Sequence, residues 1–146
     1  MTNFQNARWR TYPHPFHAIL IGGSLTLFLA TLLSDLAYSS SAEIQWKNFS
    51  SWLLVGALVL GGFALLWAVV DLIRARDRGG ARMVYPLVLL AAWIAGFINA
   101  LIHAKDAWAS MPDAVIVSVI TLILIAIAAW LGFTPRGSRG GRGELA

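Results

Sequence analysis

Long apolar stretches alternate with short polar segments along the chain. Three stretches are uninterrupted and a less pure one precedes them; together they cover residues 16–38, 52–70, 84–102 and 114–133. A helix needs about 20 residues to cross the hydrocarbon of a bilayer, so each stretch has the length of one crossing. Lipid also requires every backbone polar group to be satisfied within its own segment, as a helix does. The pattern therefore predicts four transmembrane helices.

The segments between these stretches are short. Short connections place consecutive helices side by side and antiparallel, so the sequence predicts an all-α four-helix transmembrane bundle in up-down-up-down order. This bundle, residues 16–133, is expected to lie between a cytoplasmic N-terminal segment, residues 1–15, and a flexible cytoplasmic tail, residues 134–146. The tail is rich in glycine and arginine, a composition typical of disorder.

The composition agrees with a membrane protein. Of the 146 residues, 58% are hydrophobic and 12% are charged, whereas about a quarter of the residues in a soluble domain are charged. The chain has no cysteine, which excludes disulfides, thiolate-bound metals and iron–sulfur clusters within it. The formal charge of +4 comes from basic residues confined to the short segments between apolar stretches. That placement favours a lipid bilayer as the partner rather than nucleic acid.

The basic residues also predict an orientation. With four crossings, all nine arginines fall on the side of the two chain ends, and only Lys47 and Lys105 fall on the other side. Arginine and lysine are enriched on the cytoplasmic side of membrane proteins. We therefore expect a multi-pass protein of the bacterial inner membrane with both ends in the cytoplasm.

Polar side chains form a stripe along the first predicted helix. At 100° per residue, His17, Ser24, Thr31 and Asp35 fall within about 40° of one another. His17 and Asp35 are then about 27 Å apart along the axis, near opposite membrane faces. Such a stripe is expected to face the bundle interior, where it either forms interhelical hydrogen bonds or lines a path for protons or small solutes.

The predicted topology gathers ionisable residues at the inner membrane face. His14 and His17 begin the first helix, and Asp71 and Arg74 are three residues apart near the end of the second. One interpretation is a histidine cap beside a surface ion pair. The other is a site for a quinone or a lipid headgroup, with histidine as the hydrogen-bond donor.

A second group is predicted at the outer face. Asn99 and His103 are four residues apart and share one face of the third helix. Asp35, Lys105 and Asp106 fall at the same level, so these five residues form the predicted outer cluster. An ionisable residue within a membrane typically marks a functional site. The alternative for His103 is an ordinary interfacial histidine.

His14, His17 and His103 are the only histidines available to haem iron. A haem between membrane helices usually takes axial ligands from opposed helices at the same depth. His14 and His17 share one helix start and His103 lies at the opposite face, so b-type haem bound by two histidines within one chain is not expected. The same separation argues against zinc. The chain also lacks a phosphate-binding glycine loop, a nucleophile elbow and an HExxH motif.

Three segments carry a family resemblance: Tyr12-Pro13-His14-Pro15-Phe16-His17, the first-span ending Leu33-Ser34-Asp35, and the third-span stretch from Phe97 to Trp108. With these segments the chain resembles the bacterial domain-of-unknown-function family twenty-two thirty-one, over about residues 12–133. It departs from the fuller pattern because no second proline follows His17 directly. The resemblance implies a four-helix membrane protein, and some members resemble membrane partners of periplasmic dehydrogenases and cytochromes.

These observations lead to two functional hypotheses. The first is a small membrane subunit of a redox complex that houses a quinone or b-type haem site, with cofactor-binding candidates His14, His17, Asp71, Asp35, Asn99 and His103. The second is a non-catalytic structural or anchoring subunit of a larger membrane assembly. In neither hypothesis is the chain an enzyme on its own, and in both its partners are other membrane subunits or further copies of itself.

Overall fold

The computed structural model describes residues 14–75 and 80–134. These residues form four long helices and one 3-10 turn: α1 (Pro15–Ser41), α2 (Ile44–Arg74), α3 (Gly80–His103), η2 (Ala107–Ser110) and α4 (Asp113–Phe133). The predicted N-terminal segment and C-terminal tail lie almost entirely outside the described residues, as do most of the arginines that predict the orientation.

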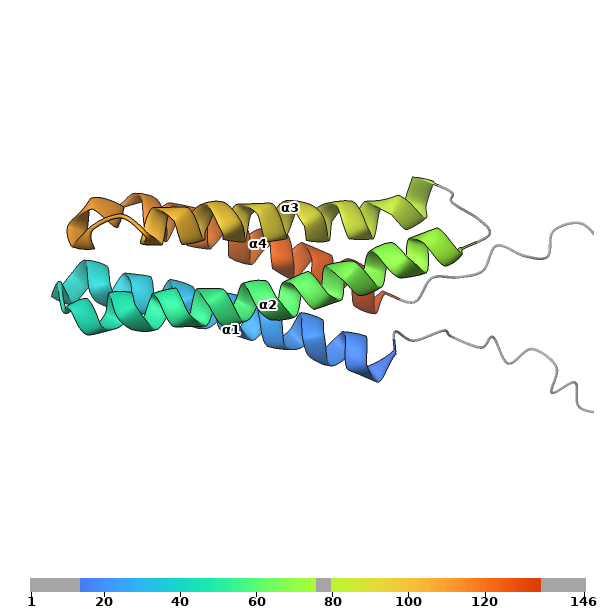
Figure 1. Cartoon of the computed structure of the whole chain (residues 1–146), viewed down its shortest axis with the longest axis horizontal. Coiled ribbons are helices and arrows are strands. Elements are labelled where there is room, and N and C mark those ends of the chain that lie inside the picture. The colour runs from blue at the N-terminus through green and yellow to red at the C-terminus, as the bar shows by residue number, and fades with distance from the viewer. Residues whose placement is uncertain (1–13, 76–79, 135–146) are drawn as a thin grey trace, which may run out of the picture.

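The helices pack as a four-membered bundle in which α1 and α3 each contact both α2 and α4. Consecutive helices run in opposite directions (Figure 1). One end of the bundle carries the α1–α2 turn, Ala42 and Glu43, together with η2; we call it the turn end. The other carries the start of α1 and the end of α4; we call it the terminal end. The predicted all-α, up-down-up-down fold is confirmed, while the end that faces the cytoplasm remains a prediction.

Local chemistry explains the ends of α1. Pro15 takes the first helical position, where its fixed φ angle is favourable and its missing N–H has no intrahelical partner to lose. Just before it, the His14 ring Nδ1 accepts the backbone N–H of Phe16 at 3.3 Å. At the other end, Ala42 adopts the left-handed conformation with φ 56° and donates its N–H to Tyr38 O. This cap reverses the chain, and α2 follows after Glu43.

Two helices begin several residues before the apolar stretches that predicted them. Helix α2 begins at Ile44, eight positions before residue 52, and α3 begins at Gly80 rather than at residue 84. The apolar stretch marks only the part of a helix that suits hydrocarbon. Backbone hydrogen bonding continues into the interface, where polar side chains are compatible with a helix.

Small residues bring the helices together in the core. Ala57, Ala64, Ala92, Ala114 and Ala128 are fully buried. At Gly96 an added Cβ would lie 2.8 Å from the Phe28 ring, so the missing side chain on α3 leaves room for a large side chain of α1 in the bundle core. Close approach over small residues is the usual way in which membrane helices associate.

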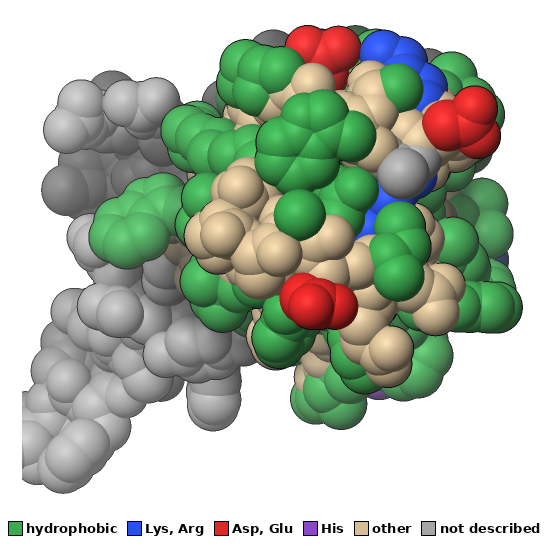
Figure 2. All heavy atoms as spheres, turned by 90° about the vertical axis from the view of Figure 1, so that its left-hand side faces the viewer, with side chains coloured by type: hydrophobic (Ala, Val, Ile, Leu, Met, Phe, Trp, Pro, Cys, Tyr) green, Lys and Arg blue, Asp and Glu red, His purple; other side chains and the backbone are tan. Residues whose placement is uncertain are grey.

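The outer surface carries large apolar side chains. Ile19, Trp52 and Trp130 are 68%, 71% and 77% exposed. Exposure on this scale around the whole bundle is unfavourable in water, and all four described helices are long and apolar enough to cross a membrane. Figure 2 looks onto the turn end, where acidic and lysine side chains lie among apolar ones. The architecture is that of a small integral membrane protein.

Candidate functional site

A polar network joins all four helices near the turn end. Its members are Asp35 on α1, Ser50 on α2, Asn99 and His103 on α3, and Ser118 on α4. We call this set the turn-end network. Asp35 and His103 are 0% and 7% exposed, and the other three side chains are also buried.

Asp35 is the centre of the network. Its Oδ1 accepts a hydrogen bond from the Ser50 hydroxyl and lies 2.9 Å from His103 Nε2. Its Oδ2 accepts from the Ser118 hydroxyl at 2.5 Å. The carboxyl group is therefore hydrogen-bonded by side chains from three other helices, as a polar group removed from water requires.

The hydrogen bonds of His103 determine where protons must lie. Its Nδ1 is 3.0 Å from Asn99 O, an acceptor only, so Nδ1 carries a hydrogen. Its Nε2 faces Asp35 Oδ1, and two lone pairs at 2.9 Å require a second hydrogen between them. The pair is thus either imidazolium with carboxylate or imidazole with carboxylic acid. Both forms are neutral overall, which suits a buried site.

Ser50, His103 and Asp35 resemble a hydrolytic triad by residue type but not by geometry. Ser50 Oγ is 2.7 Å from His103 Nε2, the nitrogen that also faces Asp35. In a triad the serine and the carboxylate contact opposite ring nitrogens, so that the imidazole can pass a proton. Here the carboxylate also accepts the serine hydrogen and Ser50 is fully buried. The arrangement does not activate Ser50 as a nucleophile.

The structure brings together only part of the predicted outer cluster. Asp35, Asn99 and His103 converge, but Lys105 and Asp106 lie on the surface. Lys105 pairs with Asp113 at 3.3 Å, with side chains 47% and 55% exposed. Lys105 and Asp106 follow the end of α3, where the chain leaves the bundle. Their inclusion in this cluster was wrong.

Sequence reasoning missed Ser50 and Ser118, although both complete the network. Serine is only mildly polar in an apolar span, and its hydroxyl usually donates a hydrogen bond to a backbone carbonyl of its own helix. A usable signal existed for Ser118, because Ser118 and Thr121 are the only hydroxyl residues within the fourth apolar stretch, residues 114–133. Ser50 precedes the second apolar stretch and gave no comparable signal.

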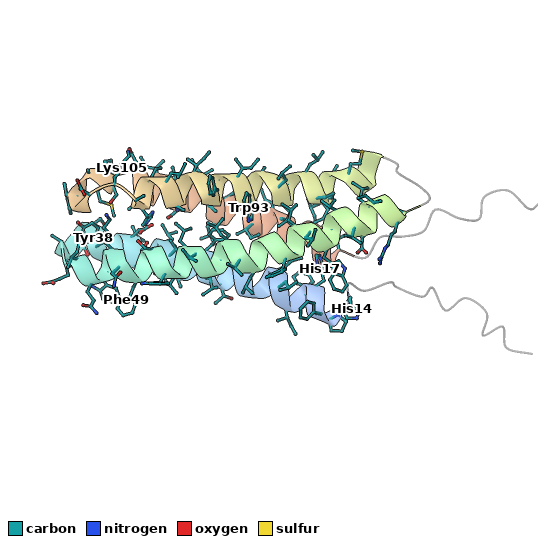
Figure 3. All side chains as sticks on the ribbon, in the orientation of Figure 1. His14, His17, Tyr38, Phe49, Trp93 and Lys105 are labelled. Carbon is teal, nitrogen blue, oxygen red and sulfur yellow. The ribbon has the colours of Figure 1, made fainter. Side chains whose placement is uncertain are left out.

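A second polar group lies at the terminal end. His17 Nε2 and Tyr85 Oη are 2.7 Å apart, joining α1 to α3. The His14 and His17 rings lie 5.3 and 6.0 Å from the Trp67 ring of α2. Figure 3 shows both histidines at this end, opposite Tyr38 and Lys105. Tyr85 was also missed by sequence reasoning, because a tyrosine near a helix end reads as an interfacial anchor.

Beside these histidines, α1 and α2 form a groove of about 320 Å³. We call it the terminal-end groove. Most of its lining is apolar or aromatic, and the last turns of α2 add one carboxylate and one guanidinium. The lining residues are Phe16, Leu20, Phe63, Leu66, Trp67, Val70, Asp71 and Arg74. Asp71 and Arg74, both predicted site residues, therefore share a wall with Trp67, whose ring contacts His14 and His17.

The predicted stripe on α1 faces inward along its whole length, since His17, Ser24, Thr31 and Asp35 are all buried. Its middle hydroxyls bond to backbone carbonyls: Ser24 donates to Ala57 O of α2 and Thr31 donates to Leu27 O. Within the described residues these bonds do not link His17 to Asp35. The stripe holds α1 in the bundle and leaves two separate polar sites, one at each end.

The histidine arrangement does not fit b-type haem within one chain. Both nitrogens of His103 are hydrogen-bonded, to Asn99 O and to the Asp35–Ser50 pair. His17 Nε2 bonds to Tyr85, and His14 Nδ1 caps α1. The described residues contain no group of three or more His, Cys, Asp or Glu side chains placed to hold a metal ion.

Comparisons with known proteins place the chain in a family but do not identify its ligand. Neither a curated protein nor a solved structure gives a significant match. One family model, described as a predicted membrane protein, matches residues 13–136. The matched range contains all four helices, the turn-end network and the terminal-end groove. By this match, the chain belongs to the DUF2231 family of predicted membrane proteins.

Proposed function

We propose that the chain is a membrane subunit of an electron-transfer assembly and that it binds a quinone in the terminal-end groove. One observation carries this proposal: the groove combines an apolar wall with the aromatic ring of Trp67 and the charged side chains of Asp71 and Arg74 at one end of the bundle. A quinone has the same division, with a flat polar ring and a long apolar tail.

The groove offers a partner for each part of that ligand. Phe63 and Leu66 are exposed toward lipid and would contact the tail. Trp67 provides a flat face for the ring, and its own ring already packs at 5.9 Å against Phe16. Arg74 can donate hydrogen bonds to a ring carbonyl, and Asp71 can accept a proton from a reduced ring. The bound quinone would supply the redox chemistry, while this chain would bind and orient it.

Placement at a bundle end favours exchange with another subunit. A ring held at the last turns of α2 would lie at the membrane interface, within reach of a partner that supplies or removes electrons. The terminal end is also the end predicted to face the cytoplasm, because the arginines cluster there in the sequence.

A filled-groove variant tests the proposal. Val70→Trp places a large ring in the terminal-end groove, and Val59→Trp adds the same ring at a lipid-facing α2 position that is 52% exposed and lies outside this groove. Binding of a short-chain ubiquinone analogue to detergent-purified protein would be measured by photo-crosslinking of an azido derivative. We expect Val70→Trp to weaken binding about tenfold or more, which corresponds to about 1.4 kcal/mol, and Val59→Trp to bind as the original chain does.

We expect the azido derivative to attach to α2 in the segment from Phe63 to Arg74, which lines the groove. Absence of saturable binding, or equal loss in both variants, would contradict the quinone proposal and leave the structural or anchoring role as the function to test next. Co-purification of the chain with a stable set of membrane proteins would then be the relevant measurement.

A further inference from the structure

We propose that the turn-end network is a proton-binding site, in which the Asp35–His103 pair takes up and releases a proton while the bundle stays folded. This site lies at the end of the bundle opposite the terminal-end groove, so it does not depend on quinone binding. The proton would be exchanged with the aqueous phase at the turn end, which His103 approaches as the last residue of α3.

The hydrogen-bond pattern leaves one proton able to move. The Ser50 and Ser118 hydroxyl hydrogens point to Asp35, and the Nδ1 hydrogen of His103 points to Asn99 O. The remaining hydrogen lies on the line between His103 Nε2 and Asp35 Oδ1, which are 2.9 Å apart. It can belong to either atom, and its release to the aqueous phase would leave a neutral imidazole and a carboxylate with one net negative charge; uptake of a proton would restore the neutral pair.

A proton fits this site, whereas a metal cation does not. Asp35 Oδ2 and Ser118 Oγ are 2.5 Å apart, and Ser50 Oγ and His103 Nε2 are 2.7 Å apart. These direct contacts occupy the space that a cation and its ligands would need. The network also supplies only one carboxylate, too little charge for a divalent ion in a low-dielectric setting.

A second observation indicates that the network has capacity for another hydrogen bond. Asn99 is 0% exposed, and its Nδ2 donates to Ser118 Oγ at 2.8 Å, but its Oδ1 has no hydrogen-bond partner among the described residues. A buried acceptor without a partner is unfavourable by about 1 to 3 kcal/mol. An internal water at this oxygen would satisfy it and would place a proton carrier beside Ser118.

Within residues 14–75 and 80–134, the other charged and titratable groups near this end make their contacts elsewhere. On α1, the Tyr38 ring packs against Trp108. On α2, Lys47 donates to the backbone of Lys105, and the Lys105 side chain pairs with Asp113 of α4. Glu43 and Asp106 are exposed. Among the described residues, Asp35 and His103 therefore face each other and neutral groups, so a proton gained or lost by one changes the hydrogen bond made by the other.

Infrared difference spectroscopy tests this coupling. The full chain would be reconstituted in phosphatidylcholine vesicles, and spectra would be compared between neutral and acidic buffer and between neutral and alkaline buffer. We expect a carboxylic-acid band from Asp35 and imidazole bands from His103 to change together. Both sets should be lost in Asp35→Asn, and both should persist in Asp113→Asn, the matched carboxylate substitution on the surface.

Ser118→Ala keeps both titrating groups and removes one donor to Asp35, so it tests the site even if Asp35→Asn fails to fold. It should shift the pH at which the coupled bands change. The proposal is overturned if the Asp35 and His103 bands stay constant at every pH at which circular dichroism shows a folded bundle, or if Ser118→Ala leaves a coupled change at the original pH.

Discussion

At the scale of single residues, the buried carboxyl of Asp35 is the feature with the largest energetic consequence. It accepts hydrogen bonds from two serines and faces His103, and it is completely removed from solvent. An ionisable group at such a position is tolerated only when it is fully partnered. Lys105 and Asp113 form the contrasting case, a pair that remains about half exposed.

We expect Asp35→Ala to destabilise the bundle much more than Asp113→Ala. Removing one partner of a buried charged pair costs about 3 to 5 kcal/mol, because the remaining groups stay buried without partners. Removing one partner of an exposed pair costs about 1 kcal/mol or less. Thermal unfolding in mild detergent, followed by circular dichroism, measures the difference. Similar melting temperatures for the two variants would show that the turn-end network contributes little to stability.

At the scale of helices, close packing depends on a few glycines. An added Cβ at Gly96 would lie 2.8 and 2.9 Å from two Phe28 ring atoms and 3.1 Å from Leu58 Cδ2. Phe28 is buried at 2% exposure and cannot move aside without displacing its neighbours. At Gly22, by contrast, an added Cβ meets nothing within 4 Å.

Gly96→Ala should therefore destabilise the protein by about 1 to 3 kcal/mol, the usual cost of overpacking a core. Gly22→Ala makes the same chemical change on α1 and should be neutral or stabilising by up to about 1 kcal/mol, since alanine favours a helix over glycine. Both variants would be compared by unfolding in detergent. Equal effects of the two substitutions would mean that Phe28 and Leu58 do not pack against Gly96 as closely as described.

The sequence predicted helices better than it predicted contacts. The apolar stretches located every crossing, and the 100° periodicity correctly placed His17 and Asp35 on an inward face of α1. Periodicity describes one helix at a time, so it could not show that Ser50 and Ser118 arrive at Asp35 from other helices. Helix rotation about its axis and relative depth decide such contacts, and both depend on packing at residues such as Gly96 and Phe28.

At the scale of the whole molecule, the bundle has two chemically different ends. The turn end carries a buried polar network beneath exposed acidic residues, and the terminal end carries an open groove beside the histidines. The asymmetry of arginine and lysine in the sequence predicts which end faces which compartment.

Single cysteines test that orientation directly, because the chain has none of its own. Glu43→Cys lies in the α1–α2 turn and Ala75→Cys lies just after α2, at opposite ends of the bundle. In intact bacterial cells expressing the protein, we expect a membrane-impermeant maleimide to label Glu43→Cys and to label Ala75→Cys only after the membrane is opened. The reverse pattern would show that the chain ends face outward.

The turn at Ala42 and Glu43 also bears on how the chain enters a membrane during synthesis. It joins α1 and α2 so closely that the two helices can insert together as a hairpin. Ser50 lies 15 residues after Asp35 and belongs to that hairpin, whereas His103 lies 68 residues after Asp35. Asp35 would thus have a hydrogen-bond donor within the same hairpin during translation, before the ribosome has made His103. The hydrogen bond from Ser50 would partly satisfy the carboxyl group until α3 is inserted.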